Sequence, residues 1–162
     1  MQTIILLAHD AGLRRGDCMR VAPIHYEAEK RLISIEQGKT KHVVTVPVSE
    51  RLAALLDTAP THSPTTPFYV LWKGDAITPH GVTSAWHTLK KKAGVDSNLW
   101  IHDLRRTLAV SLYEVSKDLR VVEQMLGHQS LTSTVRYLEH RDPGKLRPYL
   151  DAIHNPTSKA VN

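Results

Sequence analysis

Two runs rich in β-branched residues, set close together in an otherwise helical sequence, constrain the fold of this chain most. The first is Arg31–Ile35 (RLISI) and the second is His42–Val48 (HVVTVPV). The connection between them, Gln37–Lys41, contains a glycine, and a short glycine-containing connection between two such runs is typical of an antiparallel hairpin. Because the flanking segments have helical spacing, we expect a mainly α protein with a small antiparallel β-sheet, an α+β fold.

The remaining segments are bounded by residues that begin or end helices. Ser49 is expected to cap a helix over 50–58, and Gly127 is expected to close another over 119–126. A third helix is expected to begin at Thr78 and to end in a basic run before Gly94. The predicted helices are 3–11, 14–21, 50–58, 78–94, 102–116, 119–126, 132–138 and 145–153.

Apolar spacing predicts which faces of these helices are buried. In the helix that begins at Thr78, the side chains expected to point inward are Val82, Trp86 and Leu89. In the helix over 102–116, the predicted buried stripe consists of Leu104, Leu108, Leu112 and Val115.

Length and composition favour one domain that binds nucleic acid. The 162 residues suffice for a single hydrophobic core. We expect a proline-rich surface loop at 59–67 and a disordered tail at 155–162. Lys and Arg number 21 against 16 Asp and Glu, giving a net charge of +5 and a pI near 9.4. That charge favours nucleic acid over an anionic membrane surface as the partner. A single cysteine excludes an intramolecular disulfide framework, and no apolar run approaches bilayer length, so we expect a cytoplasmic protein without a membrane partner.

Five polar positions have both a chemical and an ordinary structural explanation. His102 and Arg105, three residues apart, could hold an anion between them or form a solvated polar helix face. His128 follows a helix-closing glycine, and Tyr137, nine residues later, could be a core or interface residue. Arg14 follows a glycine break and could pair on the surface with Asp17.

Together with Lys39 in the hairpin turn, these residues are cationic donors and a phenol, without clustered carboxylates. The missing carboxylate pair disfavours glycosidases and aspartic proteases, and the missing H-E-x-x-H and P-loop motifs disfavour zinc proteases and NTPases. Arginines that bind phosphate oxygens, a tyrosine that attacks phosphorus and a lysine or histidine that moves protons suit phosphoryl transfer. We expect no metal and no cofactor.

Four motifs, taken in order, resemble the catalytic domain of the tyrosine recombinases, the phage integrase family. They are GLRRGD, GKTK in the predicted hairpin, HDLRR and LGHQSLTSTVRY, and the likeness runs from about Met1 to His140. The resemblance implies a catalytic-domain fold of that family and six catalytic residues: Arg14, Lys39, His102, Arg105, His128 and Tyr137. It also implies a supporting role for Asp17.

The resemblance implies a role for each of these residues. Tyr137 would attack the scissile phosphate, giving a 3′-phosphotyrosyl link, while Arg14 and Arg105 stabilise charge on the non-bridging oxygens. Lys39 would protonate the leaving 5′-oxygen, and His102 would assist proton transfer at the nucleophile. His128 would hydrogen-bond the phosphate or orient the site.

The resemblance also implies an organisation and partners. Residues 1–154 would form the catalytic domain, without the N-terminal core-binding domain usual in the family. The partner would be double-stranded DNA, in a prokaryotic cell or a mobile element of a bacterial host. The chain would be a monomer without DNA, and 145–153 could dock on a neighbour in a homotetramer on DNA. The residues expected to contact DNA outside the catalytic set are Lys41, Arg106, Lys90, Lys91 and Lys92.

Two alternatives remain open at this point. A type IB topoisomerase-like nicking and closing enzyme would use the same chemistry. A non-catalytic DNA-binding domain could retain the fold without the activity.

Overall fold

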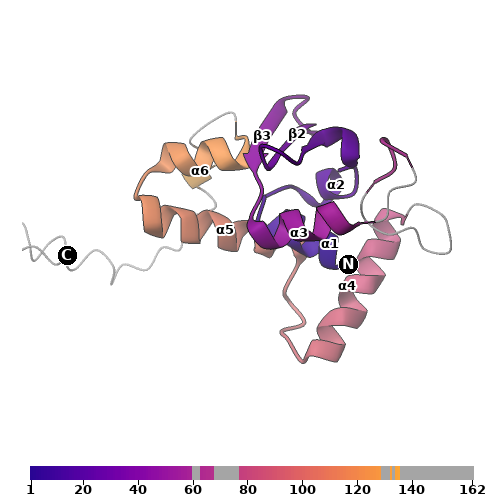
Figure 1. Cartoon of the computed structure of the whole chain (residues 1–162). Helices are drawn as coiled ribbons and strands as arrows, with labels where there is room; N and C mark the ends of the chain where they lie inside the picture. The colour runs from indigo at the N-terminus through magenta and orange to yellow at the C-terminus, as the bar shows by residue number, and fades with distance from the viewer. Residues whose placement is uncertain (60–62, 68–76, 129–131, 133, 136–162) are drawn as a thin grey trace, which may run out of the picture.

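The computed structural model describes residues 1–59, 63–67, 77–128, 132, 134 and 135. Figure 1 shows a small sheet on one side of a group of helices, with α4 extending away from the sheet. The elements are α1 (Gln2–His9), α2 (Arg15–Cys18), the 3-10 helix η1 (Pro23–His25), β1 (Tyr26–Glu27), β2 (Leu32–Glu36), β3 (Val43–Pro47), α3 (Glu50–Thr58), α4 (Pro79–Ala93), α5 (Ile101–Ser116) and α6 (Leu119–Leu126). The predicted mainly α fold with a small antiparallel sheet is confirmed.

The predicted hairpin is the pair β2–β3, to which β1 adds a short third antiparallel strand that the sequence did not suggest. The register places Ile33 opposite Val46 and Ile35 opposite Val44, and all four side chains are buried. Alternate residues of each strand face solvent, so one face of the sheet covers the core.

Helix α1 lies at the centre of the molecule and packs against α2, α3 and α5. Its Ile4 and Leu7 are almost completely buried in the main core, which continues to the inner face of the sheet. The chain leaves α1 through Gly12, whose φ of +63° lies in the left-handed region. A Cβ there would approach methyl groups of Leu108 and Leu126 to 3.0 Å, so glycine is required for both reasons.

The predicted capping residues are confirmed. Ser49 Oγ accepts from the backbone N–H of Leu52 at the start of α3, and Thr78 Oγ1 accepts from Gly81 at the start of α4. Gly94 and Gly127 end α4 and α6 in the left-handed conformation. Local sequence therefore determines where these helices begin and end.

Two predictions about buried helix faces are wrong. Leu89 is 37% exposed and its neighbour Lys90 is buried instead, because the Lys90 ammonium donates to backbone carbonyls of the segment after α4. Val115 is 85% exposed, since it lies near the end of α5. The buried positions of α5 are Ile101, Arg105 and Ala109, and Leu104 and Leu112 are only partly buried.

Several predicted segments fall wholly or largely outside the described residues. These are the helix over 132–138, the helix over 145–153, the tail over 155–162 and part of the loop over 59–67. Among the helices that the structure does describe, none is long and apolar enough to cross a membrane.

Candidate active site

Five of the six predicted catalytic residues lie in the described part of the chain, on separate elements. Arg14 precedes α2, Lys39 lies in the β2–β3 turn, and His102 and Arg105 lie on the first turns of α5. His128 follows the end of α6. Tyr137 lies outside the described residues.

Arg105 is the centre of this site. Its side chain is 1% exposed, and its guanidinium donates to the backbone carbonyls of Gly12 and, at 2.8 Å, Leu126. Nη2 also lies 3.0 Å from Nε2 of His128. These contacts join the ends of α1 and α6 to α5. The interpretation of Arg105 as part of a solvated polar face is therefore wrong.

Gln37, the residue after β2, connects the two arginines, and no sequence motif singles it out. It is fully buried, its Oε1 accepts from Arg14 Nη1 and from Thr40 Oγ1, and its Nε2 donates to the Leu126 carbonyl at 3.2 Å. The same carbonyl accepts from Arg105. A continuous chain of hydrogen bonds therefore runs from Arg14 through Gln37 and Leu126 to Arg105 and on to His128.

Asp17 holds the turn that carries Lys39. Its Oδ1 accepts from the backbone N–H of Gly38 at 3.0 Å and from Arg20 at 2.6 Å. Arg20 also donates to the carbonyl of Glu36, at the base of the same turn. The interpretation of Asp17 as a surface partner of Arg14 is wrong, since Asp17 is buried and pairs with Arg20.

Lys39 is exposed at the tip of this turn, and in the described part of the chain it has no ion-pair partner. It lies close enough to His102 for its charge to affect the pKa of that imidazole. Lys41, two residues later, is exposed, and its Nζ lies 3.6 Å from Oε1 of Glu36. The turn thus presents one lysine toward the site and one toward a surface carboxylate.

The surroundings of both histidines favour the neutral imidazole over the protonated one. Partial burial, and then the charges of Arg105, Arg14 and His102, lower the pKa of His128 to about 4. Partial burial lowers the pKa of His102 as well, followed by Arg105, with Arg14 and Lys39 acting in the same direction and Asp103 opposing them. The charges of Arg14 and Arg105 act on both imidazoles and that of Lys39 acts on His102, so these three cations lie around the two histidines and suit a phosphate group.

Carboxylates and metal ligands do not gather in this cluster. In residues 1–59, 63–67, 77–128 and the three described positions beyond, no three His, Cys, Asp or Glu side chains are grouped so that they could hold a metal ion. The positive charge of the described site comes from arginine and lysine.

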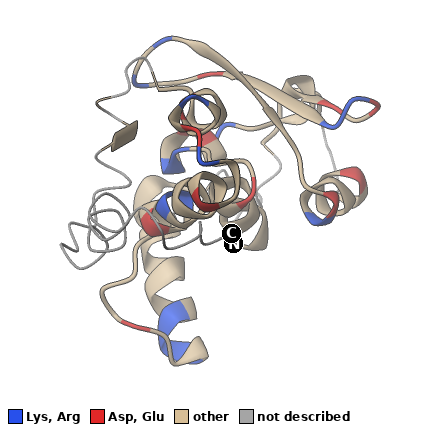
Figure 2. Cartoon of the chain, turned by 90° about the vertical axis from the view of Figure 1, so that its left-hand side faces the viewer, with Lys and Arg blue, Asp and Glu red and all other residues tan. Residues whose placement is uncertain are grey.

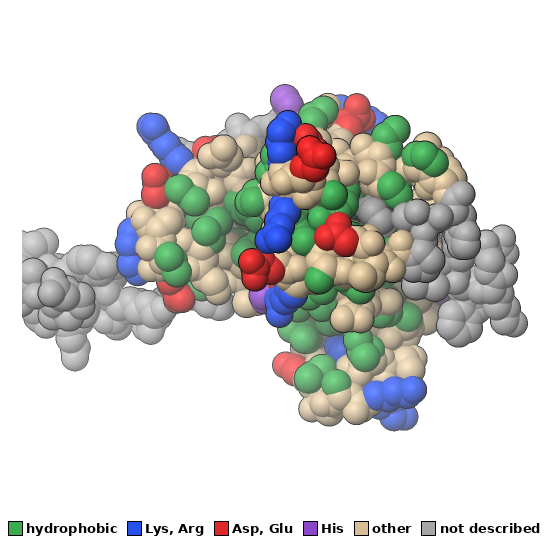
Figure 3. All heavy atoms as spheres, viewed as in Figure 1, with side chains coloured by type: hydrophobic (Ala, Val, Ile, Leu, Met, Phe, Trp, Pro, Cys, Tyr) green, Lys and Arg blue, Asp and Glu red, His purple; other side chains and the backbone are tan. Residues whose placement is uncertain are grey.

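The expected DNA-contacting residues differ in their surroundings. Lys90 is 3% exposed, and its ammonium donates to the carbonyls of Ser97 and Leu99, so it holds the segment that leads into α5 instead of facing a partner. Lys91 and Lys92 are exposed in the last turn of α4, at the end of the helix farthest from the sheet (Figure 2). On the face shown in Figure 3, basic and acidic side chains are interspersed, so positive charge is not concentrated there.

Comparisons with known proteins agree with this architecture. The sequence pattern of the Phage integrase family matches residues 1–143. The tyrosine recombinase XerC of Methylobacterium sp. (strain 4-46) is 31% identical over 156 residues, covering 93% of this chain and 48% of that protein. XerC of Haemophilus ducreyi is 30% identical over 156 residues, covering 91% of this chain and 50% of that protein. The chain thus spans about half the length of the curated relatives it matches.

Solved structures show the same fold. A XerA recombinase superposes with a TM-score of 0.74 at 24% identity, covering 95% of this chain and 57% of that one. The XerH site-specific recombinase bound to its difH substrate superposes with a TM-score of 0.71 at 22% identity, covering 93% of this chain and 45% of that one. The catalytic-domain fold expected from the sequence is therefore confirmed.

Proposed function

The chain belongs to the phage integrase family, and on that premise we propose that it is the catalytic domain of a site-specific tyrosine recombinase. Its reaction would cleave and rejoin DNA strands through a 3′-phosphotyrosyl intermediate. The observation that carries this proposal is the hydrogen-bonded chain that links Arg14, Gln37, Arg105 and His128 in one positive cluster. Such a cluster stabilises the charge of a phosphate as its oxygens become more negative.

In the proposed first step, the hydroxyl of Tyr137 attacks the scissile phosphorus and loses its proton to a neutral histidine, His102. The bond from phosphorus to the 5′-oxygen breaks, and Lys39 gives that oxygen a proton. Rejoining reverses these transfers, with a 5′-hydroxyl of a partner strand as the nucleophile. Because the phosphotyrosine conserves the energy of the phosphodiester, ATP takes no part.

The arginines have distinct surroundings in this proposal. Arg105 is buried and fixed by two backbone carbonyls, so one edge of its guanidinium is a rigid part of the structure. Arg14 is held by a single neutral amide, which leaves its positive charge available to the phosphate. A planar donor suits two phosphate oxygens better than a lysine ammonium does.

Double-stranded DNA is the proposed partner. Solved relatives include XerH bound to its difH substrate and the Tn1549 transposon integrase in complex with transposon right end DNA, and these complexes support the proposal. The bacterial sources of the XerC relatives support a place with the DNA of a bacterial cell or its mobile elements. We further propose that subunits assemble as a tetramer on DNA through the segment 145–153.

A pool of nicked duplexes with randomised arms tests the proposed activity. Cleavage close to the nick releases a short strand, so the covalent adduct is trapped and the captured DNA can be sequenced. We expect a protease-sensitive adduct with the wild-type chain. Binding without an adduct would instead favour a non-catalytic DNA-binding domain, and relaxation of supercoiled plasmid without strand exchange would favour a topoisomerase-like enzyme.

Arg105→Lys and Arg106→Lys form a matched pair in this assay, since both keep the charge and lie on adjacent positions of α5. Loss of one transition-state contact lowers a rate roughly 10²–10³-fold, so Arg105→Lys should cleave DNA more slowly than wild type by that factor. Arg106→Lys should retain cleavage within about threefold, because Arg106 lies outside the proposed catalytic set and its charge is expected to contribute to DNA affinity alone. Equal cleavage by the two variants would contradict the role of Arg105.

A further inference from the structure

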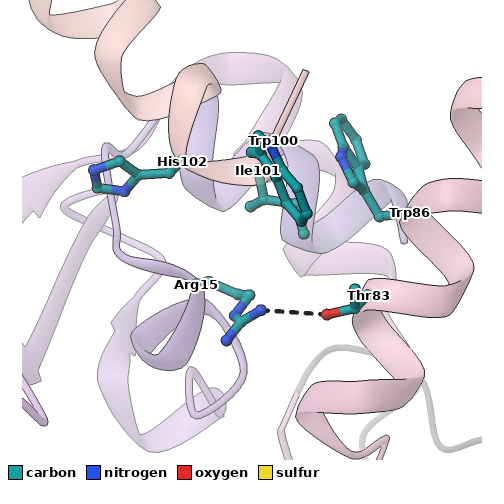
Figure 4. A pocket seen from close by; sticks show the side chains of 6 residues that line it. All are labelled: Arg15, Thr83, Trp86, Trp100, Ile101 and His102. Carbon is teal, nitrogen blue, oxygen red and sulfur yellow. Dashed lines mark hydrogen bonds between the residues drawn. The ribbon is translucent and has the colours of Figure 1, made fainter. Parts of the chain in front are cut away.

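A cavity of about 200 Å³ lies beside the catalytic cluster, between α2, α4 and the start of α5. It is lined by Arg15, Thr83, Trp86, Trp100, Ile101 and His102 (Figure 4). The two indoles lie on one side of the cavity, and the imidazole of His102 points away from them. His102 lines this cavity and also belongs to the cluster, so the two places are neighbours. We call the cavity the Arg15–Trp100 pocket.

Trp100 occupies a position where a different residue would stabilise the helix more. It is the N-cap of α5, and its side chain makes no capping hydrogen bond, whereas Ser, Thr, Asp or Asn would. The indole is 51% exposed. An exposed tryptophan at a capping position breaks a local rule, and such violations are expected at functional sites.

The indole is also held in place before any partner arrives. The His87 ring meets it edge-on, with centroids 5.6 Å apart, and the Lys90 ammonium lies 5.3 Å from its centroid. Lys90 also donates to the carbonyl of Leu99, the residue before Trp100. A fixed aromatic side chain with exposed surface loses little conformational entropy when it binds.

Arg15 supplies the charge of the pocket. It follows Arg14 directly, but Arg14 contacts Gln37 whereas Arg15 Nη1 donates to Thr83 Oγ1 at 3.3 Å. No carboxylate in the described ranges forms an ion pair with Arg15, and the side chain is exposed. The two consecutive arginines thus present their charges to two neighbouring places, the catalytic cluster and the pocket.

We propose that the Arg15–Trp100 pocket receives the deoxyribose-phosphate unit of the nucleotide next to the scissile phosphate. Arg15 would pair with the neighbouring phosphate, and Trp100 would pack against the apolar face of the sugar. A cavity of about 200 Å³ is smaller than the roughly 300–1,000 Å³ of small-molecule sites, so it suits one unit of a polymer that is anchored next door. The inference rests on the proposed function, because it takes the cluster as the place of the scissile phosphate.

A chemical double-mutant cycle tests the phosphate contact. Duplexes with a single methylphosphonate, which removes one phosphate charge, are compared for binding to proteins with Arg15 and with Arg15→Gln, all in a Tyr137→Phe background. When the methylphosphonate replaces one of the two phosphates next to the scissile phosphate, the protein with Arg15 should bind DNA about tenfold more weakly. The Arg15→Gln protein should bind almost unchanged, because its contact with that phosphate is already lost. Arg31→Gln, which removes an exposed arginine that precedes β2 and pairs with Glu50 outside the pocket, should show additive effects at every position.

Trp100→Ala and Trp100→Phe test the sugar contact. The alanine variant should bind DNA about tenfold more weakly, because roughly 60 Å² of apolar surface withdrawn from water is worth that factor, and phenylalanine should restore most of it. Thermal unfolding of both variants shows whether α5 still folds. Unchanged affinity of a folded Trp100→Ala, or additive effects of Arg15→Gln at every methylphosphonate, would overturn the proposal.

These binding measurements do not depend on cleavage. Coupling at one phosphate with no adduct from the wild-type chain would support the pocket and refute the proposed function. An adduct from the wild-type chain without coupling at any phosphate would support the proposed function and refute the pocket.

Discussion

Nη2 of Arg105 lies 3.0 Å from Nε2 of His128, although the two residues are 23 positions apart in the sequence. Because arginine can only donate, Nε2 of His128 accepts, and the ring proton is assigned to Nδ1, which lies 3.0 Å from the hydroxyl of Thr134. The contact thus selects one neutral tautomer of His128. It also explains why a histidine in this position resists protonation.

The first prediction concerns stability against pH. The folded-state pKa of His128 is about 4, below the value of about 6.5 in an unfolded chain, so the unfolded chain binds more protons between these values. The stability of the neutral contact is present above about pH 6.5 and is lost as the pH falls toward 4. Urea unfolding at about pH 7.5 and pH 5 should show a smaller loss for His128→Asn than for the wild-type chain. Equal losses would mean that His128 does not carry the effect.

The second prediction concerns Gln37. Gln37→Met keeps the volume but removes the acceptor of Arg14 and one donor to the Leu126 carbonyl, so it should cost about 1–3 kcal/mol of unfolding free energy. It should also reduce adduct formation, since Arg14 is no longer held. Thr40→Val removes only one donor to the same amide and is the control. If Gln37→Met destabilises the fold without slowing cleavage by the folded fraction, Gln37 is structural alone.

The third prediction separates two kinds of lysine in one helix turn. Lys90→Met should cost about 1–3 kcal/mol of unfolding free energy, because the Ser97 carbonyl loses the ammonium that donates to it and the Leu99 carbonyl keeps only the donor from Trp86 Nε1. The double variant Lys91→Met and Lys92→Met should leave stability unchanged. If both lysines contact phosphates, the variant should flatten the slope of log K against log salt by about 1.8, at roughly 0.9 per contact. An unchanged slope would remove Lys91 and Lys92 from the DNA interface.

The fourth prediction concerns the segment after Tyr137, the proposed nucleophile, and this segment lies outside the described residues. Deleting 143–162 should leave single-strand cleavage largely intact and weaken assembly of several subunits on DNA. Sedimentation of the wild-type and shortened chains with a nicked duplex measures this. Equal assembly by the two chains, or unfolding of the shortened chain, would show that 145–153 belongs to its own domain.

The elements that could be predicted are those fixed by local chemistry. The hairpin follows from β-branched runs around Gly38, and α3 follows from the cap at Ser49. The helix-ending glycines Gly94 and Gly127 adopt the left-handed conformation for which they were identified. Each of these features depends on interactions between residues only a few positions apart, so the local sequence is enough to predict it.

The surroundings of the site residues could not be predicted, because they depend on contacts between distant segments. Arg105 is buried because carbonyls at the ends of α1 and α6 face it, 93 and 21 residues away. Gln37 has no local signal of burial, since a glutamine beside a hairpin turn is ordinarily exposed. The burial of Lys90 likewise depends on the path of the chain through Ser97 and Leu99.

The most direct test of the account is to identify the residue that carries the DNA in the trapped adduct. Mass spectrometry of the digested adduct should find the DNA remnant on the peptide that contains Tyr137, and Tyr137→Phe should form no adduct while binding DNA within a few-fold of wild type. An adduct on any other residue, or an adduct formed by Tyr137→Phe, would contradict the account.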